Sequence, residues 1–171
     1  MAVSDSRPTI LVIDDEPQVR ELTRRALEPE FSVLEAADGE AGLAFLDQPH
    51  TTIDLVITDF IMPRIHGLAV MTVLARYRPE VPVIGITGHI DSALWEAAAK
   101  YGVRVLEKPF DLGALLASVR EELAASRDVR TVQARTKARA GGPRPQGAAG
   151  LVAAAKALAL LIKAPCSSGM L

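Results

Sequence analysis

Short apolar runs alternate with longer segments of helical periodicity along the first 125 residues. The apolar runs are rich in Val and Ile and cover residues 9–14, 31–36, 53–58, 81–87 and 103–107. Runs of this length without polar alternation are typical of strands in a parallel sheet that is covered on both faces. We therefore interpret each of them as a buried strand.

Each apolar run is followed by a segment in which apolar residues recur every three or four positions. The predicted helices cover residues 16–28, 39–47, 67–77, 91–101 and 111–125. Pro17 is tolerated in the first turn of the first helix, and Asp111 fits the N-cap of the last one. Five strands and five helices in strict alternation predict an α/β fold with a five-stranded parallel sheet, doubly wound and flavodoxin-like.

The charge distribution divides the chain into two parts. Residues 1–125 carry a balance of −9 and residues 126–171 a balance of +7, which together give the net charge of −2. We expect one domain over residues 8–125, followed by a basic tail rich in Gly, Pro and Ala over 126–171. The tail is predicted to be disordered, apart from a weakly helical segment near 151–163 that would be marginal alone in water.

Composition narrows the class of protein. Hydrophobic residues make up 49% of the chain and charged residues 23%, as in globular domains. The single cysteine, Cys166, excludes an intramolecular disulfide and fits a reducing compartment. The first residues lack a signal-peptide pattern and no stretch is long and apolar enough for a membrane span, so we expect a cytoplasmic protein.

Polar residues gather where the predicted strands end. Asp14 and Asp15 end the first strand, Asp59 follows the third, Thr87 ends the fourth and Lys108 follows the fifth. Parallel strands bring their carboxyl ends to one edge of the sheet, and ligands bind there at the point where the strand order reverses. We therefore expect these five side chains to line one site.

These residue types together suit phosphoryl chemistry beside a metal. Three neighbouring carboxylates repel one another unless a cation lies among them, and hard oxygen ligands suit Mg²⁺. Lys108 offers a positive charge to an anionic group and Thr87 offers a hydroxyl donor. A carboxylate at the same place is a candidate nucleophile.

The motifs at these positions resemble the receiver domain of bacterial two-component response regulators, of the single-domain type with a chemotaxis-regulator-like fold. The matching pieces are VIDDEP (12–17), DFIMPRIHG (59–67), GITGH (85–89) and EKPF (107–110). The resemblance covers about residues 8–125. It implies a phosphoprotein that works in a phosphorelay and accepts its phosphoryl group from a sensor histidine kinase or a histidine phosphotransfer protein.

The resemblance also implies a role for each residue of the site. Asp59 would be the phosphoacceptor. Asp14, Asp15, Asp59 and the backbone carbonyl of Ile61 would hold Mg²⁺, Asp14 mainly through a metal-bound water. Lys108 would bind a phosphoryl oxygen, Thr87 would act as the switch, and the bond between Lys108 and Pro109 would be cis.

Three positions are possible modulators of this site. Receivers often carry Tyr or Phe where this chain has Val105, whose stiff side chain puts an aromatic switch in doubt. Ile61 is apolar where many relatives are polar, and it would hinder the attacking water and lengthen the life of the acyl phosphate. His89 is expected at the rim of the pocket, by its place two residues after Thr87.

The expected function is a single-domain response regulator that is not an enzyme beyond catalysing its own phosphorylation and dephosphorylation. Its downstream protein partner would bind the face formed by the fourth helix, fifth strand and fifth helix, where Trp95 is predicted to be partly exposed. The alternative is a metal-dependent aspartyl-phosphate phosphatase or phosphotransferase. Such enzymes usually need an acid where Ile61 stands, which counts against this alternative. A flavodoxin-like cofactor carrier is a third possibility, but DDEP replaces its phosphate loop.

Some of these residues also have simpler interpretations. Asp15 would act additionally as the cap of the first helix. Lys108, at a polar edge, would contribute little to stability. The tail lacks the patterned helices of a DNA-binding helix-turn-helix, so no direct DNA binding is expected. Membrane contact by the tail is not expected either: an alanine-rich extension without a role is favoured over an amphipathic docking helix.

Overall fold

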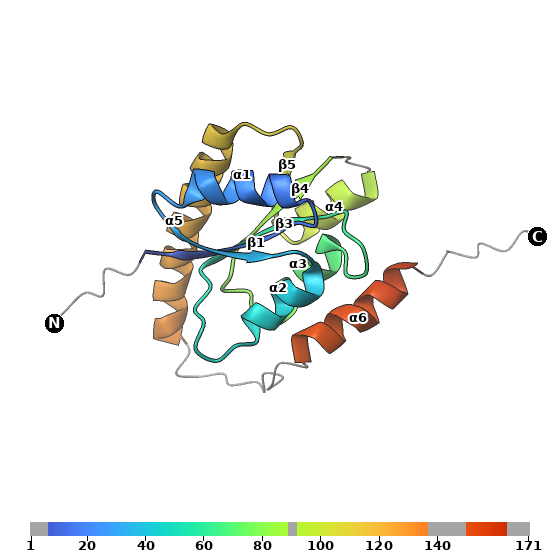
Figure 1. Cartoon of the computed structure of the whole chain (residues 1–171). Coiled ribbons are helices and arrows are strands. Elements are labelled where there is room, and N and C mark those ends of the chain that lie inside the picture. Colours follow the sequence, from blue (N-terminus) through green and yellow to red (C-terminus); the bar gives the residue numbers. More distant parts are fainter. Residues whose placement is uncertain (1–6, 89–91, 137–149, 164–171) are drawn as a thin grey trace, which may run out of the picture.

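The structure, a computed structural model, describes residues 7–88, 92–136 and 150–163 of the chain. Its elements are, in chain order, β1 (Thr9–Ile13), α1 (Pro17–Leu27), β2 (Ser32–Ala36), α2 (Gly39–Leu46), β3 (Leu55–Asp59), α3 (Gly67–Tyr77), β4 (Val83–Thr87), α4 (Ser92–Lys100), β5 (Arg104–Glu107), α5 (Leu112–Thr136) and α6 (Gly150–Lys163). The predicted alternation of five strands and five helices is confirmed, and α6 follows it (Figure 1).

The five strands form one parallel sheet in the order β2-β1-β3-β4-β5. The order reverses at β1: β2 lies on one side of it, and β3, β4 and β5 follow on the other. In register, Ile13 of β1 is paired with Thr58 of β3. The residues that follow this pair therefore emerge side by side at the switch point, where doubly wound folds bind their ligands.

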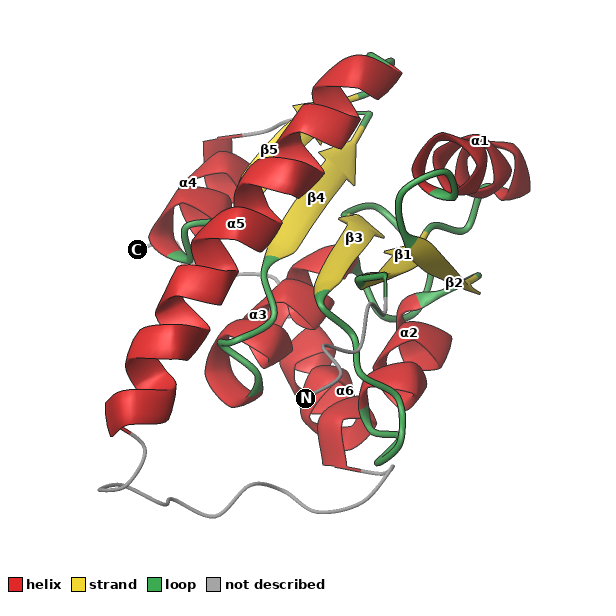
Figure 2. Ribbon diagram, turned by 90° about the vertical axis from the view of Figure 1, so that its left-hand side faces the viewer, coloured by secondary structure: helices red, strands yellow, loops and turns green. Residues whose placement is uncertain are grey.

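Helices cover both faces of the sheet, as Figure 2 shows. Successive residues of a strand point to opposite faces, so Ile10 and Val12 pack with α1 and α5, whereas Leu11 and Ile13 pack with α2 and α3. Both faces are therefore apolar, which explains the unbroken hydrophobic runs in the sequence. Each fully buried aliphatic side chain contributes about 1.5–3 kcal/mol to folding.

Helix α5 is longer than the sequence pattern predicted. It continues to Thr136, past the expected end at residue 125. The helix therefore crosses the boundary between the acidic part of the chain (1–125) and its basic part (126–171). Residues 126–136 contain neither Gly nor Pro, so nothing in their backbone chemistry stops the helix. Residues 126–136, which the sequence predicts to be disordered, are therefore helical. The same prediction for residues 137–149 and 164–171 lies outside the described part of the chain.

Helix α6 coincides with the predicted helical segment near 151–163, but it is not a free extension. It packs on α2 and α3, and its Leu151 and Ala155 are buried in the same core cluster as residues of those helices. Tertiary contacts of this kind supply the stability that a helix of this length lacks in water. Among the described helices, none combines the length and the apolar character that crossing a membrane requires.

Candidate functional site

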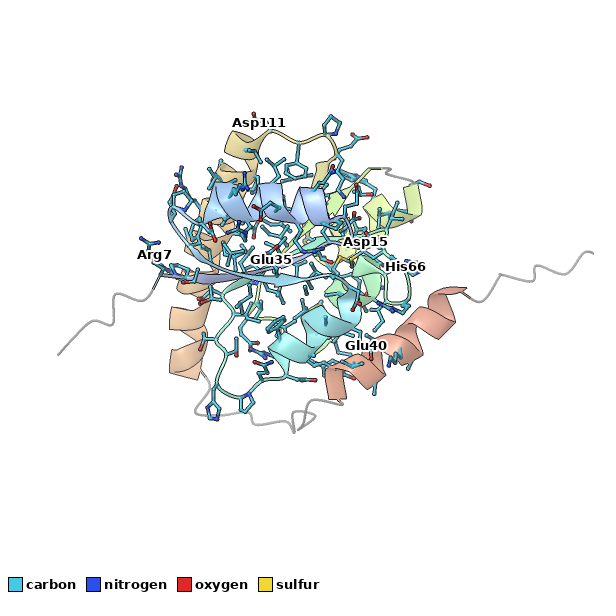
Figure 3. All side chains as sticks on the ribbon, viewed as in Figure 1. Arg7, Asp15, Glu35, Glu40, His66 and Asp111 are labelled. Atoms are coloured by element: carbon cyan, nitrogen blue, oxygen red, sulfur yellow. The ribbon has the colours of Figure 1, made fainter. Side chains whose placement is uncertain are left out.

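Three carboxylates meet at the switch point of the sheet. Asp14 follows β1, Asp59 ends β3, and Asp15 lies beside them, with ligand oxygens of all three within 4.8 Å of one another. Asp14 and Asp59 are only 2% and 4% exposed, whereas Asp15 is exposed to solvent. Figure 3 labels Asp15. The predicted convergence of the acids is therefore what the fold produces.

The ammonium of Lys108 lies among these acids. Its Nζ donates to Asp59 Oδ2 at 2.6 Å, to Glu16 Oε1 at 3.0 Å and to Asp14 Oδ2 at 3.1 Å. The backbone N–H of Lys108 also donates to the carbonyl of Thr87 at 2.8 Å, which fixes the start of the loop after β5 against the end of β4. In this arrangement the lysine partly neutralises the acids that the sequence brings together.

Backbone hydrogen bonds hold two of the carboxylates in place. Asp14 Oδ1 accepts from the N–H of Glu16, and Asp59 Oδ1 accepts from the N–H of Ile61, both at 2.8 Å. Each carboxylate thus uses Oδ1 for its own turn and turns Oδ2 toward Lys108. This division leaves the positions of both acids fixed by the loops that carry them.

Burial and charge act against each other at this site. Burial raises the pKa of Asp14; the Glu16 N–H and Lys108 oppose this rise, and the charge of Asp59 adds to it. Burial lowers the pKa of Lys108, but its hydrogen bonds with Asp59, Glu16 and Asp14 outweigh burial and raise that pKa overall. Lys108 is therefore a firmly held cation, and a further positive charge near Asp14 would oppose the rise in the pKa of that acid.

The donor set fits a hard divalent cation. Carboxylate oxygens from Asp14, Asp15 and Asp59 lie close enough to share one ion, and the exposure of Asp15 leaves room for water ligands. Mg²⁺ prefers oxygen ligands of this kind and keeps several waters. Asp15 is free for such a role because the N-cap of α1 is Glu16, so the interpretation of Asp15 as the helix cap is wrong.

The remaining predicted residues take different places. Thr87 ends β4 and is fully buried, and the bond between Lys108 and Pro109 is cis, as predicted. Val105 is half-buried on β5, in register with Gly85. Ile61, two positions after Asp59, is 56% exposed. His89 lies outside the described residues, and the role of the Ile61 carbonyl as a metal ligand stays a prediction.

Sequence reasoning missed Glu16. Its carboxylate is the second-nearest partner of the Lys108 ammonium, although its side chain is largely exposed. The available signal was its place in the DDEP segment, directly after the acid pair at the end of a strand. Ligands of doubly wound folds bind at the switch point of the sheet. Each polar residue of a loop that starts there is therefore a candidate site residue.

The first residue of α3 packs directly against the backbone of Asp59. A Cβ atom on Gly67 would lie 2.0 Å from the Asp59 carbonyl oxygen, so Gly67→Ala must displace backbone. We expect this variant to lose about 1–3 kcal/mol of unfolding free energy, measured by urea denaturation. Gly88→Ala is the matched control, because its Cβ would meet open space. Equal stability of the two variants would contradict this close packing.

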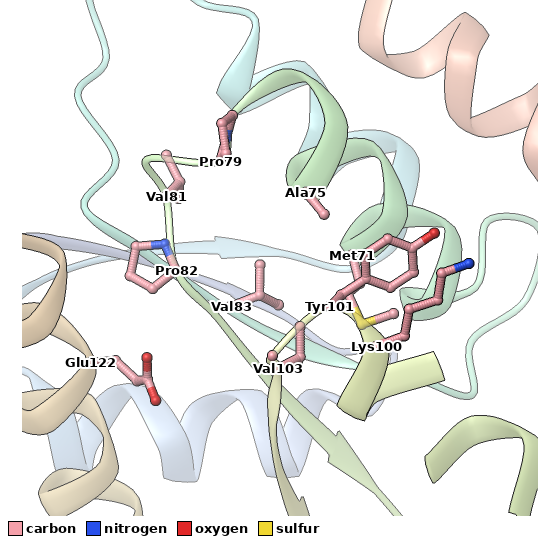
Figure 4. Close-up of a pocket in the computed structure, with 11 residues that line it drawn as sticks. Met71, Ala75, Pro79, Val81, Pro82, Val83, Lys100, Tyr101, Val103 and Glu122 are labelled. Carbon is pink, nitrogen blue, oxygen red and sulfur yellow. The ribbon is translucent and has the colours of Figure 1, made fainter. Parts of the chain in front are cut away.

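A separate cavity of 380 Å³ lies at the other end of the sheet (Figure 4). It is lined by Met71, Ala75, Pro79, Val81, Pro82, Val83, Lys100, Tyr101, Gly102, Val103 and Glu122. Val83 starts β4 and Val103 precedes β5, whereas the carboxylate site lies where these strands end. The cavity therefore has no part in the chemistry of the acids.

Comparisons with known proteins agree with this geometry. The family model described as response regulator receiver domain matches residues 10–120. The chain is 39% identical over 118 residues to the transcriptional regulatory protein FixJ of Azorhizobium caulinodans, covering 67% of this chain and 54% of that protein. It is 33% identical over 119 residues to the sensor kinase CckA of Brucella abortus, covering 67% of this chain and 12% of the kinase.

Solved structures show the same fold. The receiver domain of a response regulator from Clostridium thermocellum superimposes with a TM-score of 0.67 at 30% identity, covering 71% of this chain and 98% of that one. The receiver domain of a CckA hybrid histidine kinase gives a TM-score of 0.56 at 35% identity, covering 67% and 98%. The match thus takes in nearly the whole of these receiver domains, but only part of the longer curated relatives.

Proposed function

This chain belongs to the family of response regulator receiver domains, and from that premise we propose that it acts as a response regulator phosphorylated on Asp59. The donor is the phosphohistidine of a sensor histidine kinase or of a histidine phosphotransfer protein. The observation that carries the proposal is the buried, backbone-fixed carboxylate of Asp59, 2.6 Å from the Lys108 ammonium and beside Asp14 and Asp15. Receiver domains generally bind Mg²⁺ at such an acidic site.

In the transfer, a carboxylate oxygen of Asp59 attacks phosphorus, the P–N bond to the donor histidine breaks, and a P–O bond forms. Mg²⁺ bound by Asp14, Asp15 and Asp59 would offset the negative charge of the phosphoryl oxygens. Lys108 gives up its contact with Asp59 Oδ2 and turns toward a phosphoryl oxygen. The protein catalyses only this transfer and the later hydrolysis, in which water attacks phosphorus and releases the Asp59 carboxylate.

Exposed Ile61 bears on how long the acyl phosphate lasts. It follows Asp59 by two positions, and an apolar side chain there offers no general acid or base to an attacking water. A phosphatase or phosphotransferase working through an aspartyl phosphate would need such a group. This favours a long-lived phosphorylated regulator over an enzyme that turns over.

The proposed partner surface is the face formed by α4, β5 and α5. Trp95 on α4 is 55% exposed, which agrees with its predicted exposure, and exposed aromatic side chains are frequent anchors in protein interfaces. Thr87 at the end of β4 would transmit the phosphorylated state to this face. Direct DNA binding and membrane contact form no part of the proposal, and the single cysteine is in keeping with a cytoplasmic location.

The test is incubation of the protein with acetyl phosphate and Mg²⁺, followed by intact-mass measurement. We expect an adduct of one phosphoryl group that persists after the donor is removed and does not form when the metal is chelated. Phosphotransfer from a purified sensor kinase should give the same adduct. Rapid release of phosphate without accumulation would instead favour the phosphatase alternative, and no adduct from either donor would contradict the proposal.

A further inference from the structure

Helix α6 is attached to the receiver by three kinds of contact. Leu151 and Ala155 are buried, and the carboxylate of Asp47 after α2 accepts a hydrogen bond from the N–H of Leu151 at 3.3 Å. Lys156 pairs with Glu40 of α2 at 2.8 Å. The ion pair is exposed and adds little, so the apolar contact and the capped helix end define the docking.

The carboxylate of Asp47 lies at the N-terminus of α6. Burial raises the pKa of Asp47, while the N–H of Leu151 at the start of α6 acts in the opposite direction. A carboxylate at a helix N-terminus is favoured by the helix dipole. The position of α6 along α2 is thereby fixed at its first turn, and the small side chain of Ala155 one turn later allows close approach.

The helices that hold α6 also hold the loop of Asp59. A Cβ on Gly39, the first residue of α2, would lie 2.6 Å from the carbonyl oxygen of Ile65. Asp38, which caps α2 by accepting from the N–H of Ala41 at 2.8 Å, forms an ion pair with Arg64 of the loop. The loop between β3 and α3 therefore packs directly against the start of α2.

The same loop shares its core with α6. Met62 and Ile65 are buried in one apolar cluster together with Leu151 and Ala155. At its end the loop is closed by a hydrogen bond from the N–H of Gly67 to the carbonyl of Phe60 at 3.2 Å. Packed protein interiors have low compressibility and transmit strain. An element that fixes the positions of α2 and α3 therefore also restricts the motion of this loop.

We propose that the α2–α3 face is a docking surface for this chain's own α6, and that docking positions the loop that presents Asp59 and Ile61. This inference rests on the function proposed above for that loop. Because coupling between two sites is reciprocal, α6 docking and metal binding at the acidic site strengthen each other. Helix α6 thus acts as a positioning element for the phosphorylation site, although it touches none of the reacting groups.

The test compares two variants of the full chain that carry the same new charge on α6. Ala155→Glu puts a carboxylate into the buried contact, whereas Ala153→Glu puts it on the exposed side of the helix. Hydrogen exchange measured without metal or phosphoryl donor should be about threefold or more faster over residues 60–67 in Ala155→Glu than in Ala153→Glu. Exchange over 150–157 should rise in the same variant.

A second variant and a second measurement test the same coupling between α6 and the loop. Leu151→Ala removes apolar contact without adding charge, and it should change the exchange in the same direction by less. Mg²⁺ affinity, measured by calorimetry, should be lower in Ala155→Glu than in Ala153→Glu. Equal exchange over residues 60–67 in these two variants overturns the inference, even if Asp59 is phosphorylated normally. Failure of phosphorylation with a clear difference in exchange would overturn the proposed function alone.

Discussion

Asp59→Asn is expected to abolish the phosphoryl adduct formed with acetyl phosphate and Mg²⁺. The amide that replaces the carboxylate is a poor nucleophile, and it also removes one of the three charges that would hold the metal. Asp14 is as buried as Asp59 and is held in the same way, by a backbone N–H and by Lys108. The variant therefore tests which of the two carboxylates accepts the phosphoryl group. Intact-mass measurement checks the result.

The matched control for this change is Asp111→Asn. Asp111 accepts a hydrogen bond from the N–H of Ala114 at 2.9 Å at the start of α5, and Asn serves equally well at such a position. This variant should therefore form the adduct as the unchanged protein does. An adduct that persists in Asp59→Asn would show that another residue is the phosphoacceptor.

Lys108→Met should destabilise the metal-free protein by roughly 2 kcal/mol. The sequence alone places this lysine at a polar edge, where little effect on stability is expected. The structure gives a different expectation, because Lys108 is the shared partner of Asp14 and Asp59, which are both buried. Removing one member of a buried charge cluster leaves the others uncompensated, which is strongly unfavourable. Methionine keeps the apolar stem and removes only the charge.

Mg²⁺ should restore much of this loss, since a divalent cation among the acids replaces the missing positive charge. Urea denaturation with and without Mg²⁺ measures both effects. Lys100→Met is the control, because Lys100 is exposed on α4 and its charge lies over the ring of Tyr101. If Lys108→Met were as stable as Lys100→Met without metal, the lysine would not be compensating the buried acids.

The sequence by itself determined the parallel sheet, the alternation of strands and helices along the chain, and most of the residues of the site. These follow from local features: side-chain periodicity distinguishes strand from helix, and strict alternation of the two forces a parallel sheet. Once the strands are parallel, the acids after the first and third strands must meet at one edge, as Asp14 and Asp59 do. Local pattern and global topology agree at these positions.

Only the tertiary structure decided how the charges are paired and what the end of the chain does. The contact between Lys108 and Asp14 joins residues 94 positions apart, and Glu16 enters the same cluster through its place on a loop. Helix α6 looks like a weak, isolated helix in sequence because its stability comes from Leu151 and Ala155 buried on α2 and α3. Packing between distant segments depends on shape and position in space, which local propensity does not encode.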